Sequence, residues 1–233
     1  MHRERGARRT DATGRNTQTP FRDPGAMSGL LTGVSFVAGV GGAVALANSP
    51  YPRPGSEPAE FRRYFTENSR SARLSAAGQL ISAVSLARFT ASVASLAERS
   101  GRGSRGLRTA AVAGGGLAAA SLAVSALHTL ALSGRWGKDD DSAATVARRA
   151  FAFGGPVHGV GYGALTGALA LAGLRTGELP RPVAIAGLVS AASGILSPLY
   201  FVKEPAGWFI PVGRFSGLLV SGIAGVRLSR RSG

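Results

Sequence analysis

Six long stretches of the chain consist almost entirely of apolar and small residues, and the segments between them hold most of the charges. The stretches cover residues 30–47, 74–97, 109–133, 151–174, 182–202 and 208–226. The hydrocarbon core of a bilayer is about 30 Å thick, and a helix needs about 20 apolar residues to cross it. Because backbone groups in lipid must be paired within their own segment, each stretch is expected to be helical. The pattern therefore predicts an all-α fold, a polytopic transmembrane bundle of six spans.

Other fold classes fit this pattern poorly. A transmembrane β-barrel needs alternating strands of about ten residues, which the sequence lacks. A soluble helical protein needs a polar face on each helix, and apolar runs of this length leave too little of one. We therefore expect a six-helix domain at residues 28–228, between a disordered basic tail at 1–27 and a short basic tail at 229–233.

The distribution of charge predicts how the bundle lies in the membrane. The 233 residues carry a net charge of +15, from 27 Lys and Arg against 12 Asp and Glu. If the N-terminus is cytoplasmic, 15 basic residues fall on the inner side and 10 on the outer side. This excess follows the positive-inside rule. It predicts a multi-pass plasma-membrane protein with both termini cytoplasmic, whose partner is the lipid bilayer and not a nucleic acid.

Two alternatives concern the first span. Translation starting at Met27 would remove most of the basic tail and leave the density of basic residues in favour of the same orientation. Residues 45–47, Ala-Leu-Ala, also resemble a signal-peptide cleavage site after an apolar segment. Cleavage there would leave five spans.

Few residue types remain that bring catalytic chemistry. The chain has no cysteine and three histidines, so thiolate metal sites and iron–sulfur clusters are excluded. The sequence contains no paired carboxylates inside a span, no His-Glu-x-x-His motif and no phosphate-binding loop with Lys. We expect no catalytic residue, no metal and no cofactor. The three adjacent Asp residues at 139–141 are expected to form a solvated loop and a helix cap.

Two arginines break the apolar pattern. Arg88 lies near the middle of the second span and Arg214 lies in the sixth, while the spans contain no Asp or Glu. An Arg at the centre of a membrane helix costs about 2.5–3.5 kcal/mol on insertion scales. Each is expected to extend toward a membrane surface, Arg88 toward Glu98, to bind backbone carbonyls, or to hold an anionic ligand or lipid headgroup.

A polar stripe runs along the fourth span. His158, Tyr162 and Thr166 follow one another at helical spacing, and His128 in the third span falls at a similar depth. Hydrogen bonds between helices are the simplest explanation. Paired imidazoles can also hold haem between helices, which leaves a haem-binding redox protein as an alternative.

Small residues repeat every four positions in three spans. The stripes are Gly155, Gly159, Gly163 and Gly167 in the fourth span; Gly213, Gly217, Ser221 and Gly225 in the sixth; and a stripe in the second span that begins with Ser75 and Gln79. Such stripes let helix backbones approach closely. They predict packing within the chain, with a homo-oligomer through one stripe as the alternative.

The longest loop on the outer side is expected to contain a short amphipathic helix. Ser56 is placed as its cap and Pro58 suits the first turn, while Phe61, Tyr64 and Phe65 fall on one face. The helix is expected either at the membrane surface or packed over the mouth of the bundle.

Several short motifs carry a family resemblance. They are YFTEN at 64–68, GGPVH at 154–158, RTGELPR at 175–181, PAGW at 205–208 and PVGRF at 211–215. With them the chain resembles an uncharacterised family of small multi-spanning membrane proteins from high-GC bacteria, which suits the preference for Arg over Lys. The resemblance implies an integral membrane protein of unknown activity and implies no catalytic residue.

Three functions follow from these observations. The leading hypothesis is a structural or interaction membrane protein without catalytic activity. The first alternative is a small carrier or binder of an anionic or lipid ligand, with Arg214, His158, Arg88 and Tyr162 as its site. The second is the haem-binding protein, through His128 and His158.

Overall fold

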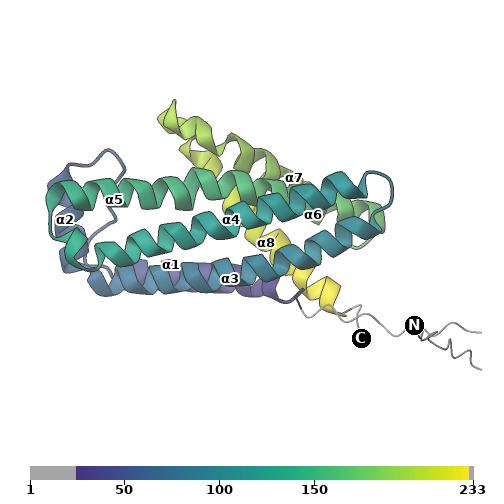
Figure 1. Cartoon of the computed structure of the whole chain (residues 1–233), viewed down its shortest axis with the longest axis horizontal. Coiled ribbons are helices and arrows are strands. Elements are labelled where there is room, and N and C mark those ends of the chain that lie inside the picture. The colour runs from purple at the N-terminus through teal and green to yellow at the C-terminus, as the bar shows by residue number, and fades with distance from the viewer. Residues whose placement is uncertain (1–24, 231–233) are drawn as a thin grey trace, which may run out of the picture.

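A computed structural model describes residues 25–230, and this part of the chain is helical without strands (Figure 1). Its α-helices are α1 (Ser28–Leu46), α2 (Pro58–Glu67), α3 (Ser69–Arg99), α4 (Ser104–Leu132), α5 (Asp140–Ala152), α6 (His158–Thr176), α7 (Arg181–Leu196) and α8 (Phe209–Arg230). Short segments complete them: η1 (Arg135–Gly137), the π-helical η2 (Phe153–Val157), η3 (Ser197–Phe201) and η4 (Glu204–Trp208).

Six helical segments are long and apolar enough to cross a membrane: Ser28–Leu46, Ser69–Arg99, Ser104–Leu132, Asp140–Thr176, Arg181–Phe201 and Glu204–Arg230. The predicted all-α bundle of six spans is therefore confirmed, and the chain is a multi-pass membrane protein. The segment Asp140–Thr176 runs for 37 residues without a break, so the predicted span at 151–174 is the second part of a longer helix. At 1.5 Å per residue this helix is about 55 Å long, which exceeds the hydrocarbon thickness.

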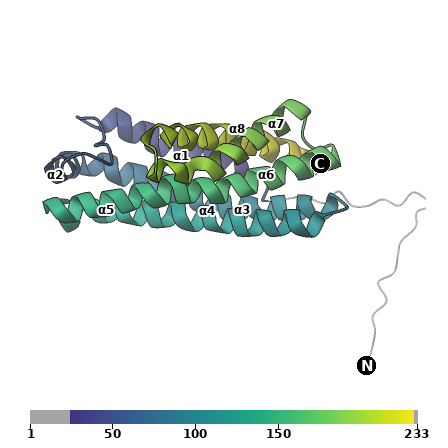
Figure 2. The same ribbon diagram turned by 90° about the horizontal axis from the view of Figure 1, so that it is seen from above.

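The long helices lie side by side along the molecule. Figure 2 shows α3, α4 and the continuous α5–α6 helix in one group, with α1, α7 and α8 laid over it. The helix α3 packs against α1 and α4, and α6 packs against α4 and α7. The last helix, α8, crosses this arrangement obliquely and contacts both α7 and α1 (Figure 1).

Glycine brings α1 and α3 into contact at their backbones. A Cβ added at Gly39 would lie 2.6 Å from the Cα of Gly78, which is nearer than real Cβ contacts allow. Two hydroxyl groups reinforce this seam, because Ser71 Oγ donates to Ala43 O at 2.6 Å and Ser82 Oγ donates to Thr32 O at 3.0 Å. Close backbone packing with interhelical hydrogen bonds replaces the hydrophobic drive that lipid does not supply.

The predicted small-residue stripes lie against neighbouring helices of the same chain. In α6, Gly159 faces Ser197, Gly163 faces Gly194 and Gly167 faces Ala191; in α8, Gly213 faces Ser193, Gly217 faces Ser190, and Gly225 faces Ala26. Ser221 accepts or donates a hydrogen bond with Tyr162. Gly155 differs, because a Cβ there would meet its nearest neighbours only at ordinary contact distance.

The amphipathic helix α2 covers the end of the bundle. Its Phe61, Tyr64 and Phe65 are buried in a cluster with α5 residues such as Ala143 and Val146. Of the two expected positions, the structure has the helix packed over the bundle, because the apolar face of α2 finds a partner in α5. The predicted cap is one residue off: Glu57 precedes the first helical residue, Pro58, and makes no side-chain cap bond.

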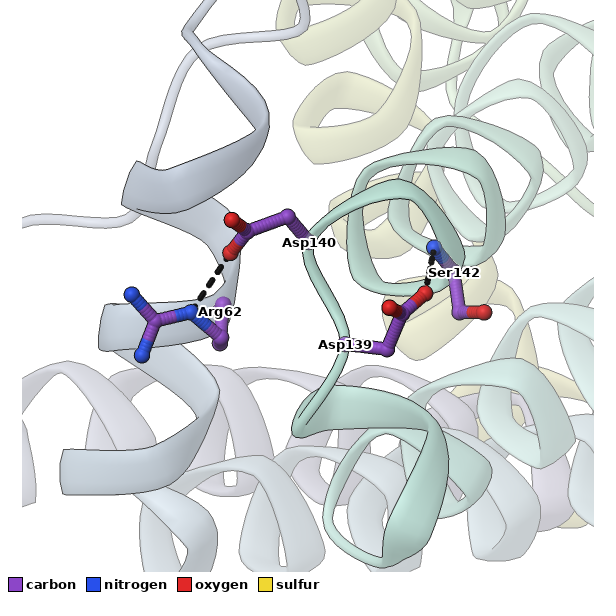
Figure 3. A network of polar contacts seen from close by, with 4 residues as sticks. All are labelled: Arg62, Asp139, Asp140 and Ser142. Atoms are coloured by element: carbon purple, nitrogen blue, oxygen red, sulfur yellow. Dashed lines mark hydrogen bonds and ion pairs between the residues drawn. The ribbon is translucent and has the colours of Figure 1, made fainter.

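Two Asp residues fix the junction between α2 and α5 (Figure 3). Asp140 forms an ion pair with Arg62 of α2 at 2.5 Å. Asp139 caps α5, and its carboxylate accepts the Ser142 N–H at 2.9 Å. This backbone hydrogen bond holds the pKa of the Asp139 carboxyl below its ordinary value of 3.8. The expected helix cap within the Asp run therefore lies at its first residue.

The connection between α7 and α8 leaves the bundle short of the end where α2 and α5 meet (Figure 1). Its apolar side chains are exposed, with Val202 at 80 % and Trp208 at 76 %. Exposed aromatic and aliphatic side chains beside a span are typical of the membrane interface. Within the predicted span at 182–202, the α-helix α7 accordingly ends at Leu196. The chain then continues as the 3₁₀ segment η3.

We predict that Gly39→Ala destabilises the bundle by about 1–3 kcal/mol, because its Cβ overlaps the α3 backbone. Gly41→Ala is the matched control, since nothing lies within 4 Å of a Cβ at Gly41. That variant should gain helix propensity. Thermal unfolding in detergent measures both, and equal melting temperatures for the two variants would contradict the close approach of α1 and α3.

The Asp139 cap makes stability depend on pH in a defined direction. A lowered folded pKa contributes stability above the ordinary carboxyl pKa of 3.8 and loses it as the pH falls through the lowered value. We expect the parent chain to melt above Asp139→Asn at about pH 7 and to approach it at about pH 2. The Asn variant keeps a cap acceptor but does not titrate, so a difference that is independent of pH would refute the charged cap.

Candidate functional site

The helix formed by α5 and α6 widens into one π-helical turn near its middle, η2. Its sequence, Phe-Gly-Gly-Pro-Val, contains Pro156, whose ring nitrogen carries no hydrogen and cannot donate to the preceding turn. Nearby carbonyls bind side chains of other helices. Ser125 Oγ donates to Ala150 O at 2.8 Å, and Ser197 Oγ donates to Pro156 O at 3.1 Å. Turns of this kind often occur at functional sites of helical proteins.

Arg214 of α8 reaches the same π-helical turn. Its Nη2 donates to Gly154 O, and its guanidinium carbon lies 4.8 Å from the centre of the Phe36 ring on α1. Its Nε is buried and has no hydrogen-bond partner within residues 25–230. The ion pairs in this part of the chain join Arg62 to Asp140 and Arg108 to Glu98, so no described carboxylate neutralises Arg214.

A cavity of about 280 Å³ lies beside Arg214, toward the end of the bundle that α2 covers. Its polar side comes from α3 and α4, through Ser71, Ser75, Gln79, Ser125 and Thr129. Its apolar side comes mainly from α1, and Tyr51, Tyr64 and Phe65 lie at the α2 end. The three rings form edge-on pairs, with centroids 5.2–5.9 Å apart. The cavity thus combines one cation, a row of hydroxyl and amide groups, and an aromatic cover.

Some of these polar groups are already engaged and others remain able to bind. Ser71 and Ser125 donate to carbonyls of neighbouring helices. Gln79 Nε2 donates to Ser75 Oγ at 3.1 Å, which leaves the Ser75 hydroxyl hydrogen and the Gln79 carbonyl free of this bond. A ligand in the cavity would therefore find donors from Arg214 and Ser75 together.

The structure places His158 and Tyr162 beside the cavity wall and not in it. Both are buried, and their rings stack with centroids 5.3 Å apart. His158 Nδ1 bonds Ala118 O of α4 at 3.0 Å, and Tyr162 Oη bonds Ser221 Oγ of α8 at 3.0 Å. Neither side chain lines the cavity. Both therefore link helices around the site.

The remaining polar residues singled out in the sequence lie apart from Arg214. Arg88 is exposed on the face of α3 that also exposes Ile81 and Val84, and Glu98 pairs with Arg108 at 2.5 Å. His128 bonds Val124 O and stacks on Phe153, with centroids 6.0 Å apart. Neither histidine lines the cavity. Residues 25–230 hold no group of three or more His, Asp or Glu able to bind a metal.

The sequence pattern indicates Arg214 but not most of the residues around it. Ser75 and Gln79 were recognised only as members of a packing stripe, while Ser71, Ser125 and Thr129 carried no signal of their own. The sequence Gly-Gly-Pro at 154–156 could have predicted the location of the site. A proline inside a membrane helix leaves backbone carbonyls without their usual donors, and side chains of other helices can then bind them.

Comparison of the chain with protein-family models, with curated proteins and with solved structures found no match.

Proposed function

We propose that this protein is a non-catalytic membrane protein that binds an anionic ligand in the cavity beside Arg214. One observation carries the proposal: a guanidinium without a described carboxylate partner borders a cavity and keeps a buried, unbonded Nε–H. A carboxylate or phosphate oxygen bound in the cavity would supply the missing negative charge. Among the functions considered from the sequence, this geometry supports the ligand binder over a purely structural role.

The haem alternative receives no comparable support. His128 and His158 stack on different aromatic rings and bond different backbone carbonyls, and neither borders the cavity.

We also propose that the cavity lies in the half of the bundle that faces the outer side of the plasma membrane. Four arginines, at positions 99, 102, 105 and 108, lie at and beside the short connection between α3 and α4, at the far end from α2, and the sequence count of basic residues also favours a cytoplasmic side there. The positive-inside rule assigns that end to the cytoplasm.

Arg214→Gln should weaken binding of butyl phosphate by about 1.5–3 kcal/mol, which is at least about tenfold in Kd. Isothermal titration calorimetry of the purified protein measures this, with butanol as the uncharged probe. Arg214→Lys should retain part of the affinity, because the charge remains without the forked donor geometry. Arg88→Gln is the control, because it also removes an arginine from an apolar stretch but lies away from the cavity. It should bind butyl phosphate with the affinity of the parent chain. Equal affinity of the parent and Arg214→Gln would disprove the site.

The orientation can be tested with single cysteines, because the chain has none of its own. A membrane-impermeant maleimide applied to intact cells should label Ser142→Cys, beside the start of α5. It should label Ser104→Cys, at the start of α4, only after the membrane is permeabilised. The opposite labelling pattern would place the cavity on the cytoplasmic side.

A further inference from the structure

A second hollow runs along the outside of the bundle between α1 and α8. This groove has a volume of about 810 Å³, and its lining is almost wholly apolar. Its walls include Leu30, Val34 and Val37 of α1 together with Leu218, Leu219 and Ile223 of α8. Val34 and Leu219 are more than half exposed, at 56 % and 62 %. In a membrane-spanning pair of helices such a face borders lipid.

The groove and the cavity beside Arg214 are consecutive parts of one seam. In α1, Gly33 and Val37 line the groove, and Val40 and Val44 continue the same helical face into the cavity. In α8, positions 226, 222 and 218 line the groove, and position 214, one turn further, is the cavity arginine. Residues three and four apart share a helix face. Arg214 therefore lies where the apolar groove meets a cavity that has polar groups along one side.

We infer that the seam binds one anionic phospholipid of the surrounding bilayer, an inference that rests on the anion site proposed above. The phosphate lies at Arg214, one acyl chain lies in the α1–α8 groove, and the headgroup enters the cavity lined by Ser75 and Gln79. This arrangement places the acyl chain against apolar walls and the headgroup beside the hydroxyl and amide groups of α3 and α4, and it pairs the phosphate with a cation that has no described counter-ion.

The shape of the site favours a phospholipid over a fatty acid. A carboxylate at Arg214 would end the ligand there and leave most of the 280 Å³ cavity unfilled. The hydroxyl and amide groups beyond Arg214 suit a headgroup such as phosphoglycerol, which has its own donors and acceptors. The aromatic cover formed by Tyr51, Tyr64 and Phe65 closes the far end and limits the size of that headgroup.

Two glycines of the groove wall have room for a Cβ. A Cβ at Gly33 would meet Leu218 at 3.7 Å, and a Cβ at Gly222 would meet Leu30 at 3.5 Å, both ordinary contacts. Leucine at either position therefore extends into the groove. Gly116→Leu on α4 is the matched control, because nothing lies within 4 Å of a Cβ there.

The experiment is native mass spectrometry of the full-length protein released from nanodiscs of phosphatidylglycerol and phosphatidylcholine. The parent chain and Gly116→Leu should retain one phosphatidylglycerol, and Gly33→Leu should retain at least tenfold less. Gly222→Leu should behave as Gly33→Leu, and it replaces that variant if Gly33→Leu fails to fold. Butyl phosphate binding by calorimetry should be equal in all four, because the cavity itself is unchanged.

Retention of phosphatidylglycerol by both groove variants would overturn the lipid assignment, and Arg214-dependent butyl phosphate binding would then leave the anion site standing. Added palmitate that displaces phosphatidylglycerol and binds equally well would assign a fatty acid instead. A dimer that Gly33→Leu dissociates would show that a second copy fills the groove. Butyl phosphate binding that is indifferent to Arg214→Gln would remove the anion site, and with it this inference.

Discussion

The guanidinium of Arg214 must be satisfied within a bundle whose apolar stretches, at residues 30–47, 74–97, 109–133, 151–174, 182–202 and 208–226, contain no carboxylate. Leaving such a charge unpaired in a medium of low dielectric is costly, so the surrounding structure has to supply acceptors and polarisable contacts. The π-helical turn supplies the carbonyl of Gly154, and Phe36 supplies the face of an aromatic ring. These two contacts hold α1, α8 and the α5–α6 helix around a single point, and the cavity is the space that remains beside it.

The small residues elsewhere make this arrangement possible. Close contact at Gly39 and Gly78 draws α1 against α3, and Gly163 and Gly194 draw α6 against α7. The first turns of α8 contact α7, and the last turns of α8 contact the beginning of α1. Buried hydroxyls of α3, α4 and α7 bind carbonyls across these contacts, which fits a bundle whose helices are held by packing and hydrogen bonds rather than by hydrophobic exclusion.

Apolar length and composition were enough to predict the spans, because the bilayer requires about 20 apolar residues per helix whatever the neighbours are. They were not enough to distinguish Arg88 from Arg214, since both interrupt an apolar run in the same way. The distinction lies in helix phase: Arg88 shares a face with the exposed Ile81 and Val84, whereas Arg214 follows Ile210 by one turn on the cavity side. The cavity itself joins residues of seven elements, and no single stretch of sequence contains that arrangement.

The most direct test of a phosphate site at Arg214 is solid-state NMR of the protein, labelled with ¹⁵N-arginine, in bilayers that contain phosphatidylglycerol. The measured quantity is the ³¹P–¹⁵N dipolar coupling between lipid phosphate and guanidinium nitrogen. The account predicts a guanidinium in direct contact with phosphate that is lost in Arg214→Gln and kept in Arg88→Gln. A spectrum in which the coupling is the same in the parent chain and in Arg214→Gln would contradict it.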